Sequence, residues 1–246
     1  MVATSQPMAT QAGLAVLQSG GNAMDAAIAA SAVLCVTEPQ ATGIGGDCFL
    51  LYHEARSGKL HGLNGSGRAP ARATLEEFER RGLMQVPEFG ILSVIVPGAV
   101  HAWQTALERF GTRSFEETLQ PAIAFAEDGY AVTPVVAKAW QNNALVLVPH
   151  AESRRDFLVD GHAPAAGTEP RFRSIAGELD SLQSRMLATY RPPVSIDQKA
   201  IHRPDRARGT RHARLARRLQ TLLQHRDRLF DELVVIVARD RVIHDF

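Results

Sequence analysis

The amino-acid sequence predicts a fold of the α/β or α+β class, in which a few short strands lie between helices. Three observations predict it: two helix signals open the chain, a hairpin of strand-like runs follows, and further helix-capping patterns come after the hairpin. The chain has 246 residues, of which 45% are hydrophobic and 22% are charged, so its composition is that of an ordinary globular protein. This length suits one large domain or two small ones.

Two helices are predicted first. Pro7 stands at the start of the first helix, and the Gly20-Gly21 pair ends it, because glycine readily adopts the left-handed backbone of a helix end. Asn22 is the predicted N-cap of the second helix, and Asp25 stands in its first turn. This second helix is rich in alanine on all sides, so we expect it to be buried, and Glu38-Pro39 ends it.

A hairpin is predicted next. Phe49 to His53 and Leu60 to Leu63 have the composition of strands, and Ser57-Gly58 forms the turn between them. Leu92 to Val96 is predicted as a further short strand, and Pro97-Gly98 as the start of a helix.

Three capping patterns predict additional helices after the hairpin. In each, a serine or threonine is followed by a glutamate three residues later or directly by a proline, as is typical of N-caps. The three patterns are Thr74 with Glu77, Ser114 with Glu117, and Thr133 with Pro134.

Charge divides the chain near its last third. Residues 1–170 hold 11 lysines and arginines against 17 aspartates and glutamates, whereas residues 171–246 hold 16 against 9, and 15 of those 16 are arginines. Residues 168–205 show no sustained period, Arg211 to Phe230 places a leucine stripe opposite arginines at helical spacing, and Leu233 to Val237 suits a strand. Such an asymmetry indicates two segments of different origin or task.

Missing motifs exclude several function classes. The sequence contains no P-loop, no complete dinucleotide-binding fingerprint, no nucleophile elbow and no zincin histidine pair. Cys35 and Cys48 lack the spacing of a zinc site, so we expect no metal and no cofactor. No apolar run approaches the ~18 residues of a membrane span. The chain begins without a secretory signal, so we expect a cytoplasmic protein that does not enter the membrane.

Two glycine-dense segments are candidates for a binding site. The first contains Gly43, Gly45 and Gly46, and the second contains Gly65, Ser66, Gly67 and Arg68. Glycine lets backbone N–H groups turn toward an anion, and an arginine can bind a carboxylate through two parallel hydrogen bonds. The alternative is that both segments are tight turns around the hairpin and that Arg68 is simply solvated. The residues by themselves leave both interpretations open.

The order of six sequence blocks resembles the γ-glutamyltransferase family. The blocks are Val2 to Pro7, Gly20 to Ala27, Glu38-Pro39, Gly43 to Gly46, Val96 to Gly98, and Phe110-Gly111. Each block is a weak signal by itself, but six in the family's order make a strong one. The resemblance extends from Val2 to about Gly167, some two-thirds of the chain.

The resemblance implies a fold and a chemistry. The family belongs to the N-terminal-nucleophile hydrolases, with an αββα sandwich and a precursor that cleaves itself into large and small subunits. A threonine at the start of the small subunit attacks the γ-glutamyl amide, with its own α-amine as the base. Glutathione and related γ-glutamyl compounds are the implied substrates, and the small-subunit segment is the implied partner. Members are often secreted or periplasmic.

The sequence departs from the family pattern at two positions. Common members place the arginine that binds the substrate's α-carboxylate at the position of Ser66, whereas this chain has Arg68 two residues later. Ser66 and Arg68 are therefore the predicted substrate-binding residues, and the form resembles a divergent bacterial branch whose members include relatives of cephalosporin acylases. Thr210 superficially resembles the nucleophile, but a basic helix follows it instead of a strand, so no catalytic residue is assigned.

We therefore expect residues 1–167 to form a large-subunit fragment, an α+β fold with part of an αββα sandwich, that is inactive without the small subunit. Residues 168–246 are expected to be a basic, arginine-rich segment, helical or disordered, that arises either from an altered reading frame or from a genuine extension. The alternative is a non-enzymatic protein whose basic C-terminal helix binds nucleic acid, an acidic partner or a membrane surface. Against nucleic acid, no aromatic residue lies between the arginines before Phe230.

Overall fold

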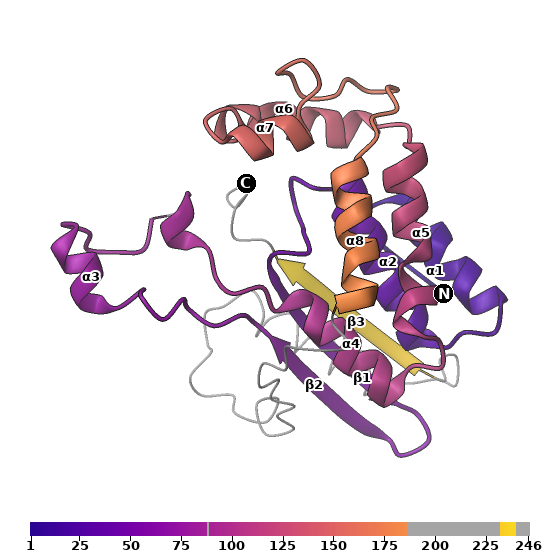
Figure 1. Ribbon diagram of the computed structural model, residues 1–246. Coiled ribbons are helices and arrows are strands. Elements are labelled where there is room, and N and C mark those ends of the chain that lie inside the picture. Colours follow the sequence, from indigo (N-terminus) through magenta and orange to yellow (C-terminus); the bar gives the residue numbers. More distant parts are fainter. Residues whose placement is uncertain (88, 186–231, 240–246) are drawn as a thin grey trace.

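The computed structural model describes residues 1–87, 89–185 and 232–239 (Figure 1). Its elements, in chain order, are α1 (Pro7–Gln18), α2 (Ala23–Thr37), β1 (Asp47–Glu54), β2 (Lys59–Gly65), α3 (Leu75–Arg80), the 3₁₀ turn η1 (Ile91–Ser93), α4 (Ala99–Phe110), α5 (Phe115–Asp128), α6 (Pro134–Leu147), α7 (Ala151–Phe157), α8 (Arg173–Arg185) and β3 (Glu232–Arg239). Helices and a small antiparallel sheet occupy separate parts of the chain, so the fold is α+β.

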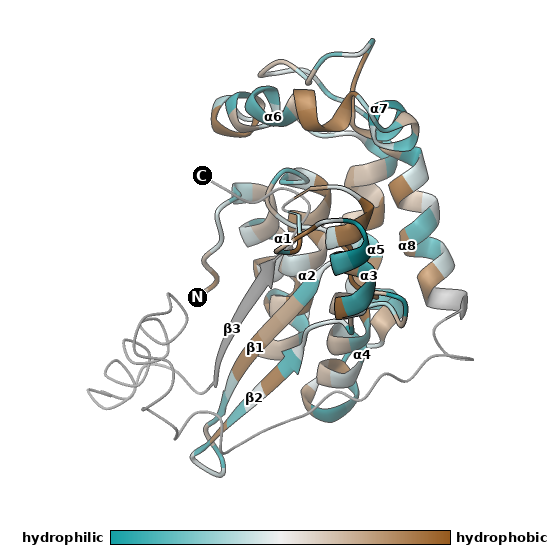
Figure 2. Ribbon diagram, turned by 90° about the vertical axis from the view of Figure 1, so that its left-hand side faces the viewer, coloured by the Kyte–Doolittle hydropathy of each residue, from teal (hydrophilic) through white to brown (hydrophobic). Residues whose placement is uncertain are grey.

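The sheet has the strand order β2-β1-β3, and both strand pairs are antiparallel. The predicted hairpin and the predicted strand at Leu233 to Val237 are thus confirmed. Along β1 the side chains of Cys48, Leu50 and Tyr52 are buried in the core, on the face that α2 and α4 cover. Figure 2 shows the three strands on one side of the molecule and the main group of helices on the other.

The two predicted N-terminal helices are confirmed, and so is the Asn22 cap. Its side-chain oxygen accepts hydrogen bonds from the backbone N–H groups of Met24 and Asp25, and the Asp25 carboxylate accepts one from the Asn22 backbone. This reciprocal capping box satisfies donors that a helix start otherwise leaves unpaired. The predicted caps at Thr74, Ser114 and Thr133 also begin helices.

The predicted strand at Leu92 to Val96 is wrong. The segment begins as the 3₁₀ turn, closed by hydrogen bonds from the Ser93 backbone and hydroxyl to the carbonyl of Gly90. Val96 then donates one backbone hydrogen bond to the carbonyl of Arg68. The β-favouring residues find no strand to pair with in the described part of the chain, so local bonds decide their conformation.

The chain continues into the helical layer beyond residue 167. Phe172 is buried against Trp140, with stacked rings whose centroids are 5.7 Å apart, and Ala176 and Leu179 of α8 are buried in the same core. The α8 helix packs along α5. The sequence shows no sustained period between residues 168 and 205, yet α8 forms within this range, because Ala176 and Leu179 are buried and Ile175 and Leu182 pack partly against the same core. The helix expected at Arg211 to Phe230 and the residue Thr210 lie outside the described residues.

A long arm extends away from the body between β2 and α4 and carries α3 and η1 (Figure 1). Several large apolar side chains of the arm are exposed, among them Leu75, Met84 and Ile91. None of the helices described is long and apolar enough to cross a membrane.

Candidate functional site

The two glycine segments meet at the start of α4. The backbone N–H groups of Gly98 and Ala99 both donate to the carbonyl of Gly46, at 3.2 and 3.0 Å. Gly98 also lies so close to the carbonyl of Gly65 that a Cβ atom there would overlap it. The segment before the sheet, the segment after the hairpin and the helix entry therefore form one packed junction.

Glycine is required at this junction because backbones approach each other closely. A Cβ atom on Gly67 would overlap the carbonyl of Val96, and one on Gly65 would overlap the side chain of Ala102. A Cβ atom on Gly45, in contrast, would have no other atom within 4 Å, so that position could carry a side chain. At Gly65 and Gly67, close packing explains the residue type without a bound anion.

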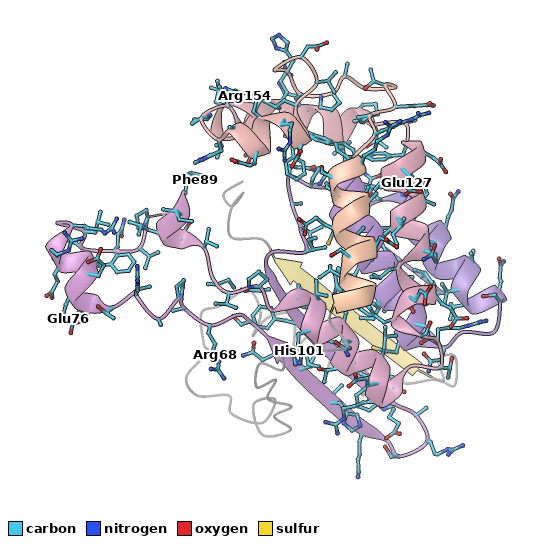
Figure 3. The ribbon with its side chains drawn as sticks, in the orientation of Figure 1. Arg68, Glu76, Phe89, His101, Glu127 and Arg154 are labelled. Atoms are coloured by element: carbon cyan, nitrogen blue, oxygen red, sulfur yellow. The ribbon has the colours of Figure 1, made fainter. Side chains whose placement is uncertain are left out.

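Ser66 and Arg68 project outward from this junction, and both are exposed. The backbone N–H of Ser66 donates to the side chain of Asn64 at 2.9 Å, which fixes the loop directly after β2. The Arg68 side chain extends away from the helices (Figure 3) and forms no ion pair with any side chain that the structure describes. The loop thus presents a guanidinium group held at its base by packed backbone. Binding of a carboxylate by Arg68 stays a prediction.

Sequence reasoning missed Asp47, the first residue of β1. Its side chain is only 3% exposed, and its Oδ1 atom is buried without a hydrogen-bond partner. Cys48 pairs with Gly65, so the same register places Asp47 beside Ser66. An acidic residue directly after a glycine segment was the available signal, but only the strand register shows which loop it faces.

Cys48 and three of the threonines have surroundings that do not activate a nucleophile. Burial raises the pKa of the Cys48 thiol to about 12, so the thiol is protonated and unreactive near neutral pH. The hydroxyl of Thr4 donates to the carbonyl of Gln6 at 2.6 Å, and the hydroxyls of Thr74 and Thr133 cap helices. The same residues contain no cluster of three or more His, Cys, Asp or Glu side chains that could hold a metal ion.

Two of the six sequence blocks stabilise the fold through hydrogen bonds between helix ends. Asp25 is fully buried, and its carboxylate accepts hydrogen bonds from the Thr112 N–H and hydroxyl at 2.9 and 2.6 Å, and from the Arg113 N–H at 3.2 Å. The Asn22 side chain donates to the carbonyl of Phe110 at 2.6 Å. These bonds join the start of α2 to the α4–α5 turn, so the Gly20 to Ala27 and Phe110-Gly111 blocks fix the helical layer.

A cavity of about 420 Å³ lies apart from this junction, between the segment after α2 and helices α6, α7 and α8. Gly43 and Ile44 line it, together with Gln40 and Trp140. Neither Ser66 nor Arg68 is among the residues that line it. Gly43 therefore faces a different part of the molecule from the second glycine segment.

Comparison with known proteins agrees with this architecture. The model of the gamma-glutamyltranspeptidase family matches residues 9–190, so the match continues 23 residues beyond the limit near Gly167 expected from the sequence blocks. The glutathione hydrolase-like YwrD proenzyme of Bacillus subtilis is 33% identical over 186 residues, which cover 75% of this chain and 35% of that protein.

Two solved structures are also similar. The cephalosporin acylase from Bacillus halodurans superposes with a TM-score of 0.69 at 42% identity, over 74% of this chain and 35% of the acylase. The Helicobacter pylori gamma-glutamyltranspeptidase gives a TM-score of 0.70 at 30% identity, over 74% of this chain and 53% of that one. The chain spans about a third of the length of the YwrD relative. The match to the family model over residues 9–190 and the likeness to these solved structures show that this chain belongs to the gamma-glutamyltranspeptidase family.

Proposed function

We propose that this chain supplies the large-subunit part of an acyl-transfer enzyme that moves γ-glutamyl groups from glutathione-like donors to water or an amine. The nucleophilic threonine and its base belong to a small-subunit segment that must associate with it. Family membership supports the chemistry. The buried, protonated Cys48 thiol and the capping roles of Thr74 and Thr133 agree with a nucleophile that comes from a second segment.

One observation supports this proposal: the second face of the sheet carries apolar side chains, and none of the described helices packs on it. Leu51 and Leu60 alternate with the core residues of β1 and β2, so they lie on the face opposite α2 and α4, and they are half-buried. In Figure 2 this side of the strands lies away from the helices. A second sheet stacked on this face would complete an αββα sandwich, since sheets bury apolar faces against each other.

The arm between β2 and α4 supports the same association. Met84 is 98% exposed and Ile91 is 80% exposed, which is unusual for large apolar side chains grouped on one segment. The small-subunit segment would cover part of this surface as well as the second face of the sheet.

Arg68 has a defined role in this proposal. Its guanidinium group binds the α-carboxylate of the γ-glutamyl donor by two parallel, charge-assisted hydrogen bonds. The packed glycine junction beneath it holds the loop in place, so the binding geometry is formed before the substrate arrives.

The direct test is complementation. We expect the purified chain to show no turnover of a chromogenic γ-glutamyl anilide with glycylglycine and no self-cleavage on a gel. The small-subunit segment of the Bacillus halodurans cephalosporin acylase suits this test, because that acylase is 42% identical to this chain over the aligned residues. Co-expression of the two should yield a complex that co-purifies and acts on γ-glutamyl or related acyl amides. Turnover by the chain without a partner would disprove the need for a second segment.

Arg68 variants test the binding role in that complex. Arg68→Ala should raise KM by at least about tenfold, because loss of a bidentate contact to a carboxylate costs ~2 kcal/mol or more. Arg68→Lys should restore little, because an ammonium group lacks the planar fork. Arg72→Ala, on the exposed start of the arm, is the matched control and should leave KM unchanged. Equal kinetics for Arg68→Ala and the control would remove Arg68 from the site.

A further inference from the structure

The inference concerns the cavity of about 420 Å³ between the segment after α2 and helices α6, α7 and α8. This volume lies within the range of ~300–1,000 Å³ that is typical of small-molecule sites. In Figure 1, α6 and α7 lie across one end of the helical layer, above α8. Segments that are far apart in the sequence therefore surround one hollow.

The wall of the cavity is largely apolar. Aromatic and aliphatic side chains from all of the surrounding segments line it, and Trp140 is 1% exposed. The apolar lining residues are Pro39, Ile44, Trp140, Leu147, Phe157 and Ile175. Such a wall favours an apolar or aromatic molecule, because burial removes the apolar surface of both partners from water.

One buried polar side chain in the wall lacks a partner. Gln40 lines the cavity, is 7% exposed, and has a buried Oε1 atom without a hydrogen-bond partner. Leaving a buried carbonyl oxygen unpaired is costly, so such a group usually has a donor in the functional state. The last torsion of a glutamine side chain is soft, so a small rotation is enough to bring this oxygen to a ligand in the cavity.

Several other polar groups of the wall already have partners. Arg155 donates two hydrogen bonds to Asp156, at 2.8 and 3.0 Å, and the Asn143 side chain donates to the carbonyl of Ala139 at 2.9 Å. Among the lining residues that the structure describes, only Gln40 has a buried side-chain oxygen or nitrogen without a partner. Gln40 is therefore the residue with an acceptor to offer a ligand.

We infer that this cavity binds a small, neutral aromatic molecule that donates one N–H or O–H group to Oε1 of Gln40. A charged ligand would lose its hydration in a largely apolar cavity, where Arg155 and Asp156 pair with each other and Glu178 is exposed. Neither Ser66 nor Arg68 lines the cavity, so the inference does not rest on the proposed function.

An ordered water is the competing explanation for the unpaired oxygen of Gln40. A buried water needs about two to four polar partners. A largely apolar wall supplies few of them, whereas an aromatic molecule with one donor suits both the apolar wall and the single free acceptor. The test must separate these two occupants.

The test compares two ligands of nearly the same shape, in ligand-observed NMR titrations of the full chain. Indole carries an N–H donor, and benzofuran has an oxygen atom in its place, so only indole can donate to Gln40. We expect indole to bind about tenfold more tightly than benzofuran, because an unpaired buried acceptor remains when benzofuran binds. Equal affinity for the two ligands, or no binding of indole, would overturn the inference without any variant.

A substitution at Gln40 then assigns the preference to this residue. Gln40→Leu should abolish the preference for indole, leave benzofuran affinity unchanged, and not lower the Tm, because it removes an unpaired acceptor. Gln141→Leu makes the same change at an exposed position of α6 outside the cavity, and it should change neither affinity. A preference for indole that survives in Gln40→Leu, or a Tm that falls below that of the control, would show that the amide serves the fold and not a ligand.

A second substitution places both ligands in the cavity. Ser153 of α7 lines the cavity and is half-buried, so Ser153→Phe fills the space with a ring and should weaken both ligands at least about tenfold. Arg68→Ala should change neither affinity, whatever its effect on γ-glutamyl donors. Unchanged binding in Ser153→Phe, or weakened binding in Arg68→Ala, would place the ligands outside this cavity and overturn the inference.

Discussion

Two buried aspartates of this chain have opposite surroundings. Asp25 is fully buried, and its carboxylate accepts hydrogen bonds from the backbones of Asn22, Thr112 and Arg113 and from the Thr112 hydroxyl. Asp47 is almost as deeply buried, and its Oδ1 atom has no partner. Both are aspartates at similar burial, yet the Asp25 carboxylate has several donors around it and the Oδ1 atom of Asp47 has none.

The difference separates a carboxylate that connects parts of the fold from one with an oxygen that the fold leaves unpaired. Asp25 connects two helix ends through donors that helix termini cannot satisfy by themselves, so its contribution is to stability. Asp47 stands where strand and loop backbones are already paired, and its Oδ1 atom accepts no hydrogen bond. Buried polar groups that the fold leaves unsatisfied are exceptions that need an explanation, such as a ligand or an ordered water.

The largest expected effect is at Asp25. Asp25→Ala removes the common acceptor of the Asn22, Thr112 and Arg113 backbone groups and leaves these buried donors unpaired. We expect a loss of about 4 kcal/mol in the free energy of unfolding, measured by urea denaturation, since each stranded donor costs ~1–3 kcal/mol. Glu127→Ala, at an exposed position of α5 (Figure 3), should cost less than about 0.5 kcal/mol. Equal losses in the two variants would contradict the structural role of Asp25.

The next effect tests the packing that holds Asp47 and Arg68 in place. Gly67→Ala puts a methyl group into the carbonyl of Val96, so the loop must move, and we expect a loss of about 2–3 kcal/mol. Gly45→Ala, in the other glycine segment, has open space at that position and should change stability by less than about 1 kcal/mol in either direction. If both variants are equally stable, the junction is looser than its backbone contacts indicate.

Local signals explain what could be predicted from the sequence. Asn22, Ser114 and Thr133 cap helices through bonds to residues two or three positions away, so short patterns identify them. Helix α8 has no such signal, because its stability comes from Phe172 and Leu179 packing into a core built by distant segments. Leu92 to Val96 has strand composition but no partner strand among the described residues, and strand pairing is a tertiary property.

The candidate site, too, can be predicted from the sequence only where its residues give a local signal. Arg68 and Ser66 stand out because a glycine-rich loop and an arginine are visible along the chain. Asp47 does not, because its importance depends on the register with β2 and on its burial, and neither quantity is local. A family resemblance directs attention to the position of Ser66, but the residue across the strands is identified only once the hairpin is formed.

A third prediction uses the neighbour of Asp47 on the core side. Burial raises the pKa of the Cys48 thiol from 9.0 to about 12, and the charge of Asp47 adds to this shift. Above about pH 9 the unfolded chain releases a proton that the folded chain keeps, so stability should fall as pH rises, by up to ~1.4 kcal/mol per pH unit. Urea denaturation at about pH 8 and about pH 10 measures the slope, and Cys48→Ser should reduce it. An unchanged slope in that variant would assign the loss to other groups.

The smallest expected effect on stability is that of Asp47→Asn, and its contrast with Asp25→Asn tests the comparison of the two aspartates. Asn has nearly the shape of Asp but carries no charge and presents an NH₂ group. Asp25→Asn aims this group at backbone donors and should cost about 2–3 kcal/mol. Asp47→Asn removes a buried charge whose Oδ1 atom has no partner, so the free energy of unfolding should stay within about 1 kcal/mol of the wild type, or rise. Urea denaturation of both variants at the same pH measures the contrast. A cost at Asp47 as large as that at Asp25 would mean that the folded chain supplies a donor to the Asp47 carboxylate.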